Sequence, residues 1–298
     1  MKEFDPLVNE AVASIKIIHG PGHPHPLSLN RKVKLLLIEQ LVGESNRMFA
    51  NILAIFSMLS GMDISYKTVE RLYSDEEVIM AIHNLHVLIL KGKDITRSDA
   101  TGDGFGYSLT VKKKCESHAQ KLKDMAKDNP DHGKDAKKSK IHRKRLFTYS
   151  FAIMDLQSRL YIAFGSSIKS EREAYDMAMK LLSSIDVEMD SIRHDRYYSS
   201  LSYMDKLDET KVFVISKKNT TLSGSQKWKD TMKEFVPDTM NYLEKYHQRS
   251  NSESVFAADK KMPGWNAAQR RNDRIDNAQI CTGVWHNMFN MRNSQNSV

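Results

Sequence analysis

The pattern of hydrophobic positions changes part-way along the chain, near Gly92. Between Leu29 and Gly92, apolar residues recur at intervals of three and four, a spacing that places them on one face of a helix. The predicted helices lie at 29–42, 46–59, 66–73 and 75–90. Ser65 and Asp75 are suitable N-caps, because their side-chain oxygens can accept hydrogen bonds from the first backbone N–H groups of a helix. Residues 29–92 are therefore predicted to be all-helical.

After Gly92, short β-type runs alternate with helical patterns. The predicted strands lie at 147–155, 159–164, 189–195 and 211–216, and the predicted helices at 171–184 and just after Ser199. Two strands come first, followed by helix, strand, helix and strand. This order is that of a mixed α/β domain and is typical of a ribonuclease H-like fold, a mixed sheet flanked by helices. We expect residues 93–290 to form this domain and residues 291–298 to be a tail.

The N-terminal 28 residues show no clear period. Proline and glycine are dense between His19 and Pro26, and they break both helices and strands. We therefore expect residues 1–28 to be a flexible segment. The histidines in this stretch could instead bind a metal, but no carboxylate or thiolate lies beside them.

The segment from Asn51 to Tyr73 reads as helix, glycine turn and helix, a pattern typical of a helix-turn-helix. In that interpretation Tyr66, Lys67, Thr68 and Arg71 would face a DNA groove or its phosphates. An ordinary helical bundle would give the same pattern, so both interpretations stay open.

Charge indicates a polyanionic partner. The 298 residues carry a formal net charge of +8, and the isoelectric point is about 9.2. Much of the excess lies between Tyr107 and Leu146, where we expect a basic insertion at 112–145. This insertion could be a solvated loop, an arm that contacts phosphates, or both. Charge alone does not distinguish nucleic acid from a membrane surface.

Other features of the composition exclude several classes of protein. The longest apolar run, Met48–Leu59, is shorter than the roughly 18 to 20 residues that span a bilayer, and the N-terminus has no signal-peptide pattern. Cys115 and Cys281 lie far apart, so neither a disulfide framework nor a CxxC zinc site is available. We expect a soluble protein of a reducing cytoplasm with no membrane partner.

The stretch YHQRSNSESVFAADK carries the most informative spacing. On a helix, Tyr246, Arg249, Glu253 and Lys260 fall within roughly 60° of one another. A carboxylate there can hold a divalent metal, while Arg and Lys on neighbouring turns can contact the phosphates of a strand being cut. A solvated charged face with intrahelical ion pairs would show the same periodicity.

A two-metal phosphodiesterase site needs further carboxylates from other elements. Asp195 ends a predicted strand, which is where open α/β sheets place ligands, although an aspartate there could also cap the following turn. Asp99 and Asp103 both precede glycine-containing turns and face the same side of an extended segment. The same glycines lack the GxGxxG spacing and lead into no helix, which argues against dinucleotide binding.

These motifs resemble those of DDE insertion-sequence transposases. The Tyr246, Arg249, Glu253 and Lys260 spacing resembles the signature around the last catalytic acid of that group. Asp195, followed closely by tyrosine, resembles its second-aspartate motif, although Arg196 and Tyr197 stand where many members have a glycine before the tyrosine. For the first acid, Asp99-Ala-Thr-Gly resembles the Asp-Ser-Thr-Gly pattern, whereas the aromatic and polar residues after Asp103 fit better, and we favour Asp103.

The resemblance implies a catalytic domain that cuts double-stranded DNA at the ends of an element and joins the freed 3′-hydroxyl to target DNA. It implies that Asp103 (or Asp99), Asp195 and Glu253 hold two Mg²⁺ or Mn²⁺ ions, that Arg249 and Lys260 contact phosphates, and that Tyr246 orients the DNA backbone. A prokaryotic cytoplasm and a homodimer assembled on DNA would follow. A transposase-derived protein that only binds DNA, and a ribonuclease H-like nuclease without strand transfer, are the alternatives.

Overall fold

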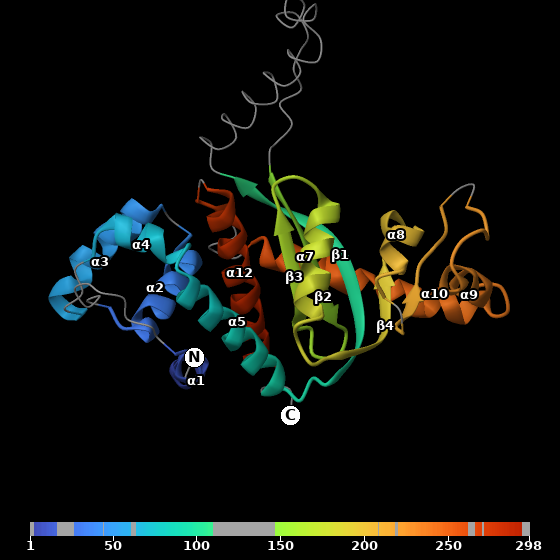
Figure 1. Ribbon diagram of the computed structural model, residues 1–298, viewed down its shortest axis with the longest axis horizontal. Coiled ribbons are helices and arrows are strands. Elements are labelled where there is room, and N and C mark those ends of the chain that lie inside the picture. The colour runs from blue at the N-terminus through green and yellow to red at the C-terminus, as the bar shows by residue number, and fades with distance from the viewer. Residues whose placement is uncertain are drawn as a thin grey trace, which may run out of the picture.

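The computed structural model describes residues 3–16, 27–43, 45–60, 64–109, 147–207, 209–217, 220–261, 266–269 and 271–293. A group of N-terminal helices lies beside a long C-terminal helix, which in turn lies beside a twisted sheet (Figure 1). The basic insertion expected at 112–145 and the histidine-containing stretch fall outside the described ranges. In the part of the chain that is described, no helix is long and apolar enough to span a membrane.

Five helices of the described residues form the N-terminal group, and all except the first follow the predicted boundaries closely. They are α1 (Phe4–Ala13), α2 (Leu29–Val42), α3 (Asn46–Ser60), α4 (Tyr66–Leu72) and α5 (Glu76–Lys91). The side chain of Ser65 accepts a hydrogen bond from Thr68 N, and that of Asp75 accepts one from Val78 N, which confirms both N-caps. Gly43 ends α2 with φ of 69°, a left-handed conformation that favours glycine.

Helix α1 corrects one expectation. Residues 4–13 were expected to be flexible with the rest of 1–28, but they form a helix whose Phe4, Val8 and Ala11 are buried. Those three positions are spaced by four and three, so they share one face. Pro6 does not interrupt the helix, because the first turn needs no backbone N–H donor there.

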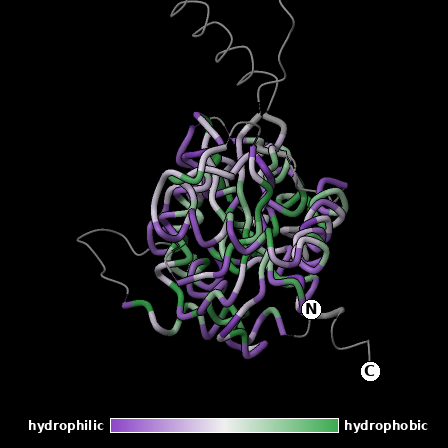
Figure 2. Tube along the Cα trace, turned by 90° about the vertical axis from the view of Figure 1, so that its right-hand side faces the viewer, coloured by the Kyte–Doolittle hydropathy of each residue, from purple (hydrophilic) through white to green (hydrophobic). Residues whose placement is uncertain are grey.

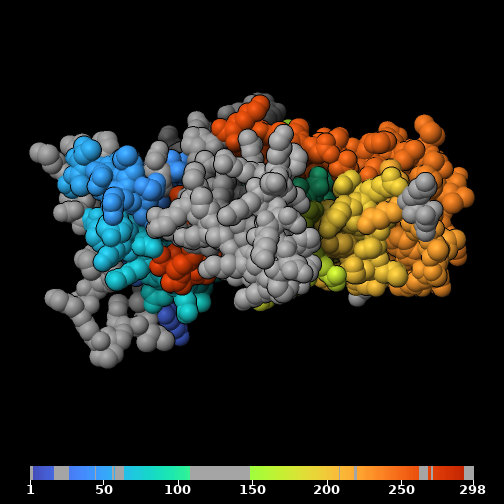
Figure 3. All heavy atoms as spheres, turned by 90° about the horizontal axis from the view of Figure 1, so that it is seen from above, coloured from blue at the N-terminus to red at the C-terminus, as the bar shows by residue number. Residues whose placement is uncertain are grey.

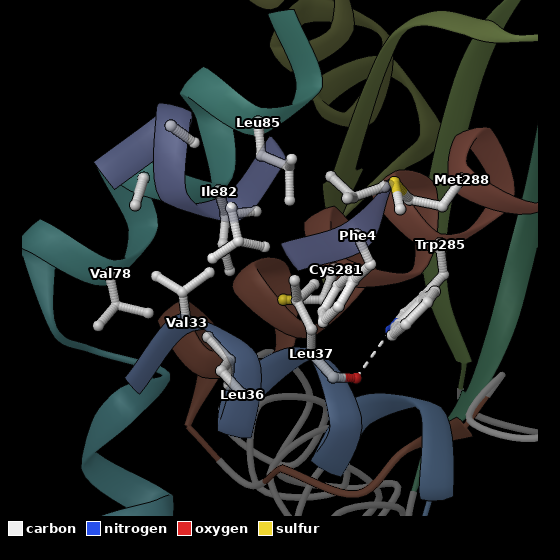
Figure 4. Close-up of a cluster of buried hydrophobic side chains, with 14 of the residues drawn as sticks. Phe4, Val33, Leu36, Leu37, Val78, Ile82, Leu85, Cys281, Trp285 and Met288 are labelled. Atoms are coloured by element: carbon white, nitrogen blue, oxygen red, sulfur yellow. Dashed lines mark hydrogen bonds between the residues drawn. The ribbon is translucent and has the colours of Figure 1, made fainter. Parts of the chain in front are cut away.

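The C-terminal helix α12 (Asn272–Asn293) shares its core with the N-terminal helices. Figure 4 shows Cys281, Trp285 and Met288 pointing toward side chains of α2 and α5. Trp285 Nε1 donates a hydrogen bond of 2.7 Å to the Leu37 carbonyl, and its ring stacks on Phe4. Segments from both ends of the sequence therefore bury one common core, and the helix continues past residue 291, where a tail was expected.

The sheet has the order β3-β2-β1-β4-β5, and a short strand, β6, pairs with the far end of β1. Strand β2 is antiparallel to both β1 and β3, whereas β4, β5 and β6 continue the sheet through parallel pairs. The strands are β1 (Arg97–Leu109), β2 (Phe147–Asp155), β3 (Tyr161–Ser167), β4 (Glu188–His194), β5 (Lys211–Phe213) and β6 (Asn266–Ala267). The predicted mixed α/β architecture is confirmed.

Both faces of the sheet are covered. Along β2, Phe151 and Ile153 pack with α7 (Glu171–Leu182), while the alternating Ala152 and Met154 pack toward α11 (Ser250–Asp259). Figure 2 shows hydrophobic residues concentrated in the interior of the molecule, with more hydrophilic ones on the outer helices. The central strand β1 therefore lies between two helical layers.

The remaining elements form the end of the molecule opposite the N-terminal helices (Figure 3). They are η2 (Arg196–Tyr198), α8 (Leu201–Met204), α9 (Gln226–Glu234) and α10 (Thr239–His247). Strand β5 ends at Phe213 and not at the expected residue 216. The reason is that the backbone N–H and C=O of Val214 both bond to the Tyr242 hydroxyl of α10.

Candidate active site

Asp103 lies in the middle of the central strand, directly opposite Ala152 of β2. Its side chain is only 17% exposed, and it accepts a 2.8 Å hydrogen bond from Gly104 N. Burial raises the pKa of this carboxyl to about 6, because the charged form loses its hydration. The hydrogen bond from Gly104 N and the charge of Arg249 act in the opposite direction, while Asp195 and Glu253 raise the pKa further.

Asp195 follows immediately after β4. Because Gly102 of β1 is the register partner of His194, the next residue of each strand lies at the same level, and these residues are Asp103 and Asp195. Neighbouring strands lie about 4.8 Å apart, so the two carboxylates come from adjacent positions on the sheet. The backbone of Asp195 also precedes η2, but its side chain makes no capping hydrogen bond there.

The signature stretch is formed by two short helices, not by one continuous helix as the periodicity suggested. Helix α10 ends at His247 and α11 begins at Ser250. Between them the bonds Arg249 N to Tyr246 O and Ser252 N to Arg249 O span three residues each, which tightens the chain by one 3₁₀-type turn. Across this break Arg249 still pairs with Glu253, one turn further along the chain.

The guanidinium of Arg249 is the centre of the site. Its Nη1 lies 2.8 Å from Glu253 Oε1, 3.6 Å from Asp103 Oδ2 and 3.9 Å from Asp195 Oδ1. Burial opposes its charge, but Tyr246 and the three carboxyls together raise the pKa of the guanidinium. The fold therefore brings Asp103, Asp195 and Glu253 around one cation.

The other two signature residues differ in exposure. The Tyr246 side chain is 5% exposed and packs against Phe213 and Tyr242. The guanidinium carbon of Arg249 lies 5.9 Å from the centre of the Tyr246 ring, so Tyr246 supports the arginine from behind and does not face outward. Lys260 is exposed at the end of α11.

Asp99 lies apart from this cluster. It precedes Asp103 by four residues on the same strand, which separates their Cα atoms by about 13 Å. Asp99 Oδ1 accepts a hydrogen bond from Ser191 and lies 3.6 Å from Arg193 Nη1. The buried Arg193 also donates to the Lys245 carbonyl, so this pair fastens the end of α10 to the sheet. The geometry favours Asp103 over Asp99 as the first acid.

The candidate DNA-contacting residues of the N-terminal helices lie elsewhere. Lys67 and Arg71 are exposed on α4, toward the opposite end of the molecule from α10 (Figure 1). Helix α4 packs beside α3, and the guanidinium of Arg47 lies 5.2 Å from the centre of the Tyr66 ring. Any DNA that touched both regions would have to extend along the length of the molecule.

Glu171 and Tyr198, which the sequence did not single out, pack against the strand beside Asp103. The buried Tyr198 hydroxyl donates a hydrogen bond to Glu171 Oε1, the first residue of α7. A Cβ at Gly104 would lie 2.3 Å from this carboxylate oxygen and 2.6 Å from the hydroxyl, so any larger residue would have to displace Glu171 or Tyr198. The glycine directly after Asp103 was the one sequence signal for this close approach.

The donor set suits a hard divalent cation. Three carboxylates from β1, the end of β4 and α11 supply only oxygen ligands, as Mg²⁺ and Mn²⁺ prefer. As placed, no three acidic, histidine or cysteine side chains in the described ranges lie close enough to share a metal ion. The Arg249 guanidinium lies among the three carboxylates, with its Nη1 within 4 Å of an oxygen of each. Asp103, Asp195 and Glu253 are therefore the residues here that could hold a metal ion.

Comparisons with known proteins give the family. No family model matches the chain. The chain is 37% identical over 293 residues to a probable transposase for the insertion sequence element ISA1214 of Archaeoglobus fulgidus. This match covers 98% of the chain and 84% of the archaeal protein, so it includes both the N-terminal helices and the sheet. The chain therefore belongs to the family of insertion-sequence transposases.

Proposed function

We propose that this protein is a DDE-type transposase that binds the ends of its insertion element, cleaves phosphodiester bonds there and joins the freed ends to target DNA. The observation that carries the proposal is the convergence of Asp103, Asp195 and Glu253 within 4 Å of one Arg249 nitrogen. The family of the chain supplies the biological setting.

The architecture supports a ribonuclease H-like catalytic domain. An antiparallel β-hairpin leads into a helix and then into parallel strands on the other side of β1. The acids lie on the central strand, at the carboxyl end of its parallel neighbour and on a following helix. Ligands of open α/β sheets collect at that kind of edge.

In this proposal Asp103, Asp195 and Glu253 hold two Mg²⁺ or Mn²⁺ ions. Such ions, when bound, activate a water and stabilise the leaving oxygen of a phosphodiester. The carboxylates orient these ions through oxygens that come from three separate elements. The hydrogen-bonded pair of Tyr198 and Glu171 lies against the backbone at Gly104, next to Asp103.

In this proposal Arg249 contacts the three carboxylates first and a DNA phosphate later. Without DNA, its guanidinium balances the three carboxylates. A DNA phosphate can accept two hydrogen bonds from a guanidinium through its two non-bridging oxygens, so the side chain can turn from the acids to the phosphate. Tyr246 then acts on DNA indirectly, because its buried ring positions the Arg249 guanidinium before DNA binds.

Double-stranded DNA is the proposed partner, at the element ends and at the target. Lys260 extends the phosphate-contacting surface beyond Arg249, while Lys67 and Arg71 provide a second basic patch on α4. Transposition joins two element ends, so we expect two copies of the chain to assemble on DNA.

The test is DNA cleavage by Glu253→Gln across a titration of Mg²⁺ and Mn²⁺, with DNA binding measured in parallel. Gln keeps the size and helix propensity of the side chain but removes its charge, so metal affinity and cutting should be lost while folding and binding persist. Glu244→Gln on α10 is the matched control, because Glu244 is an exposed carboxylate on the neighbouring helix.

Equal cutting by Glu253→Gln and the parent at low metal would overturn the proposal. A strand-joining assay on the same substrate separates the remaining classes. Cutting without joining would identify a nuclease, and metal-independent binding without cutting would identify a protein that only binds DNA.

A further inference from the structure

The far end of α11 is held by a buried polar cluster that lies outside the signature residues. Asp259, the last residue of the helix, is 4% exposed. Its Oδ2 accepts a hydrogen bond of 2.5 Å from the hydroxyl of Tyr161, the first residue of β3. His286 of α12 places Nδ1 3.0 Å from Asp259 Oδ1. We call these three residues the α11 anchor.

His286 has polar partners at both ring nitrogens, and its Nε2 also lies 3.0 Å from Asn290 Nδ2. Its Nε2 lies 2.9 Å from the backbone carbonyl oxygen of Arg159, and Nδ1 faces the Asp259 carboxylate. Neither a carbonyl nor a carboxylate can donate a hydrogen bond. A hydrogen on Nδ1 therefore lets the ring donate to the Asp259 carboxylate. Arg159 has φ of 61°, the left-handed conformation that gives this turn its shape.

Tyr161 is fixed independently of its hydroxyl. Its ring stacks on His286 with centroids 3.7 Å apart and an interplanar angle of 15°. Its backbone is bracketed by Asn287 of α12, which accepts from Tyr161 N at 2.7 Å and donates to Tyr161 O at 2.8 Å. Burial, and then the nearby Asp259, raise the pKa of the Tyr161 hydroxyl, so it remains a donor. The anchor therefore joins α11 to both the sheet and α12.

Helix α11 has few other buried attachments. Phe256 stacks on Phe105 of β1 with centroids 4.4 Å apart, and Ser252 is buried near the start of the helix. Glu253 lies six residues before Asp259, about 9 Å along the axis. Its carboxylate can lie beside Asp103 of β1 only if α11 keeps one position along its axis and one rotation about it.

The structure assigns a positioning role to the α11 anchor: Asp259, His286 and Tyr161 set the place of Glu253 in the metal site. This inference rests on the proposed function, because it concerns the same site. None of the three residues lies among the acids around Arg249. The anchor acts through the helix, as supporting groups of metal sites do when they orient a ligand.

The test uses full-length Tyr161→Phe and Asp259→Asn, with Asp276→Asn as the matched control. Asp276 also joins α12 to β3, by accepting a 3.0 Å hydrogen bond from Ser166, but it does not touch α11. Mn²⁺ affinity is measured by electron paramagnetic resonance, with and without duplex DNA. Loss of a supporting hydrogen bond at a metal site typically weakens affinity by about 10- to 100-fold. We expect about 10-fold for Tyr161→Phe, more for Asp259→Asn, and little change for Asp276→Asn.

Hydrogen exchange provides a readout that needs no metal. Amides of residues 250–259 should lose protection in the two anchor variants and keep it in the control. A merely structural role predicts a lower Tm with unchanged Mn²⁺ affinity of the folded protein, and that result would overturn the inference. Asp259→Asn leaves the His286 imidazole in place without its carboxylate partner. If that variant folds poorly, Tyr161→Phe, which removes only one hydroxyl, keeps the test valid.

Glu253→Gln in the same titration separates two kinds of failure. If Glu253→Gln weakens Mn²⁺ binding while Tyr161→Phe does not, the positioning role fails and the proposed function stands. If Glu253→Gln binds Mn²⁺ as the parent does, the metal site itself is wrong, and both proposals fall.

Discussion

Asp103 and Glu39 lie in two regions of this molecule that treat a desolvated carboxyl group in opposite ways. Around Arg249, Asp103 is desolvated but receives a backbone hydrogen bond and a neighbouring cation, and its pKa rises to about 6. In the helical core, Glu39 is 1% exposed, and neither of its side-chain oxygens has a hydrogen-bond partner among the residues that the structure describes. Burial raises the pKa of Glu39 to about 8.

The two carboxyl groups differ in whether a hydrogen bond and a nearby cation offset the cost of burial. A carboxyl without a partner avoids the cost of a buried charge by keeping its proton, so Glu39 is a neutral acid at neutral pH. The carboxyls around Arg249 share a cation and remain partly exposed, with Glu253 at 54% and Asp195 at 40%. The buried Glu39 can only affect stability, whereas the acids around Arg249 present oxygens where a ligand can reach them.

The largest expected effect distinguishes the two aspartates of β1. Asp103→Asn should reduce DNA cutting by at least about 1000-fold, because it removes a charge from the site where two cations must be held. Asp99→Asn is the matched control, and we expect it to change cutting by less than about 5-fold, since Asp99 contacts Arg193 and Ser191 instead. Single-turnover cleavage of element-end DNA gives both rates. The reverse ranking would make Asp99 the first acid.

The second prediction concerns the pH dependence of stability. Between about pH 4.5 and 8 the unfolded chain ionises Glu39 while the folded chain keeps it protonated, so this group makes the protein less stable as pH rises. Glu39→Gln removes that slope. At about 1.4 kcal/mol per pH unit, the variant should gain on the order of 3–4 kcal/mol relative to the parent between pH 5 and pH 8.

Urea unfolding of both proteins at the two pH values measures this gain. Glu244→Gln, which changes an exposed glutamate, should show no comparable difference between pH 5 and pH 8. An equal pH dependence for Glu39→Gln and the parent would mean that Glu39 finds a partner or water in solution.

Arg249→Ala should change two affinities in opposite directions. Binding of element-end DNA should weaken by about 10-fold, as expected for one lost charge-assisted contact. Mn²⁺ binding in the absence of DNA should tighten, because the competing guanidinium is gone from among the acids. Arg97→Ala, which removes an exposed arginine paired with Asp190 near the start of β1, is the control. Weaker Mn²⁺ binding by Arg249→Ala would show that the arginine supports the acids and does not compete with cations.

The smallest effect is expected on α4. Lys67→Ala combined with Arg71→Ala should lower DNA affinity by about 5-fold and reduce the slope of log affinity against log salt by roughly two, if both contact phosphates. Fluorescence anisotropy at several salt concentrations measures the slope. An unchanged slope would leave α3 and α4 as part of an ordinary helical bundle.

Local patterns were sufficient for most elements and for the residues of the signature. The caps at Ser65 and Asp75, the strand at 147–155 and the helix beginning at Glu171 depend on neighbours close in sequence, so the sequence predicts them well. The spacing from Tyr246 to Lys260 is also local. Helix α1 was missed, because its apolar face is short and gains its stability from Trp285 and other residues far along the chain.

Only the tertiary structure separates the surroundings of Asp99 and Asp103, and so favours Asp103 as the proposed first acid, because both occupy the same face of one strand. The choice depends on the β1–β4 register, which places Asp103 level with Asp195, and on α11, which brings Arg249 and Glu253 to that level. It likewise revealed the α11 anchor, whose members lie 98 and 27 residues from Asp259 in sequence. Contacts over such separations are set by packing and strand register, and no local periodicity records them.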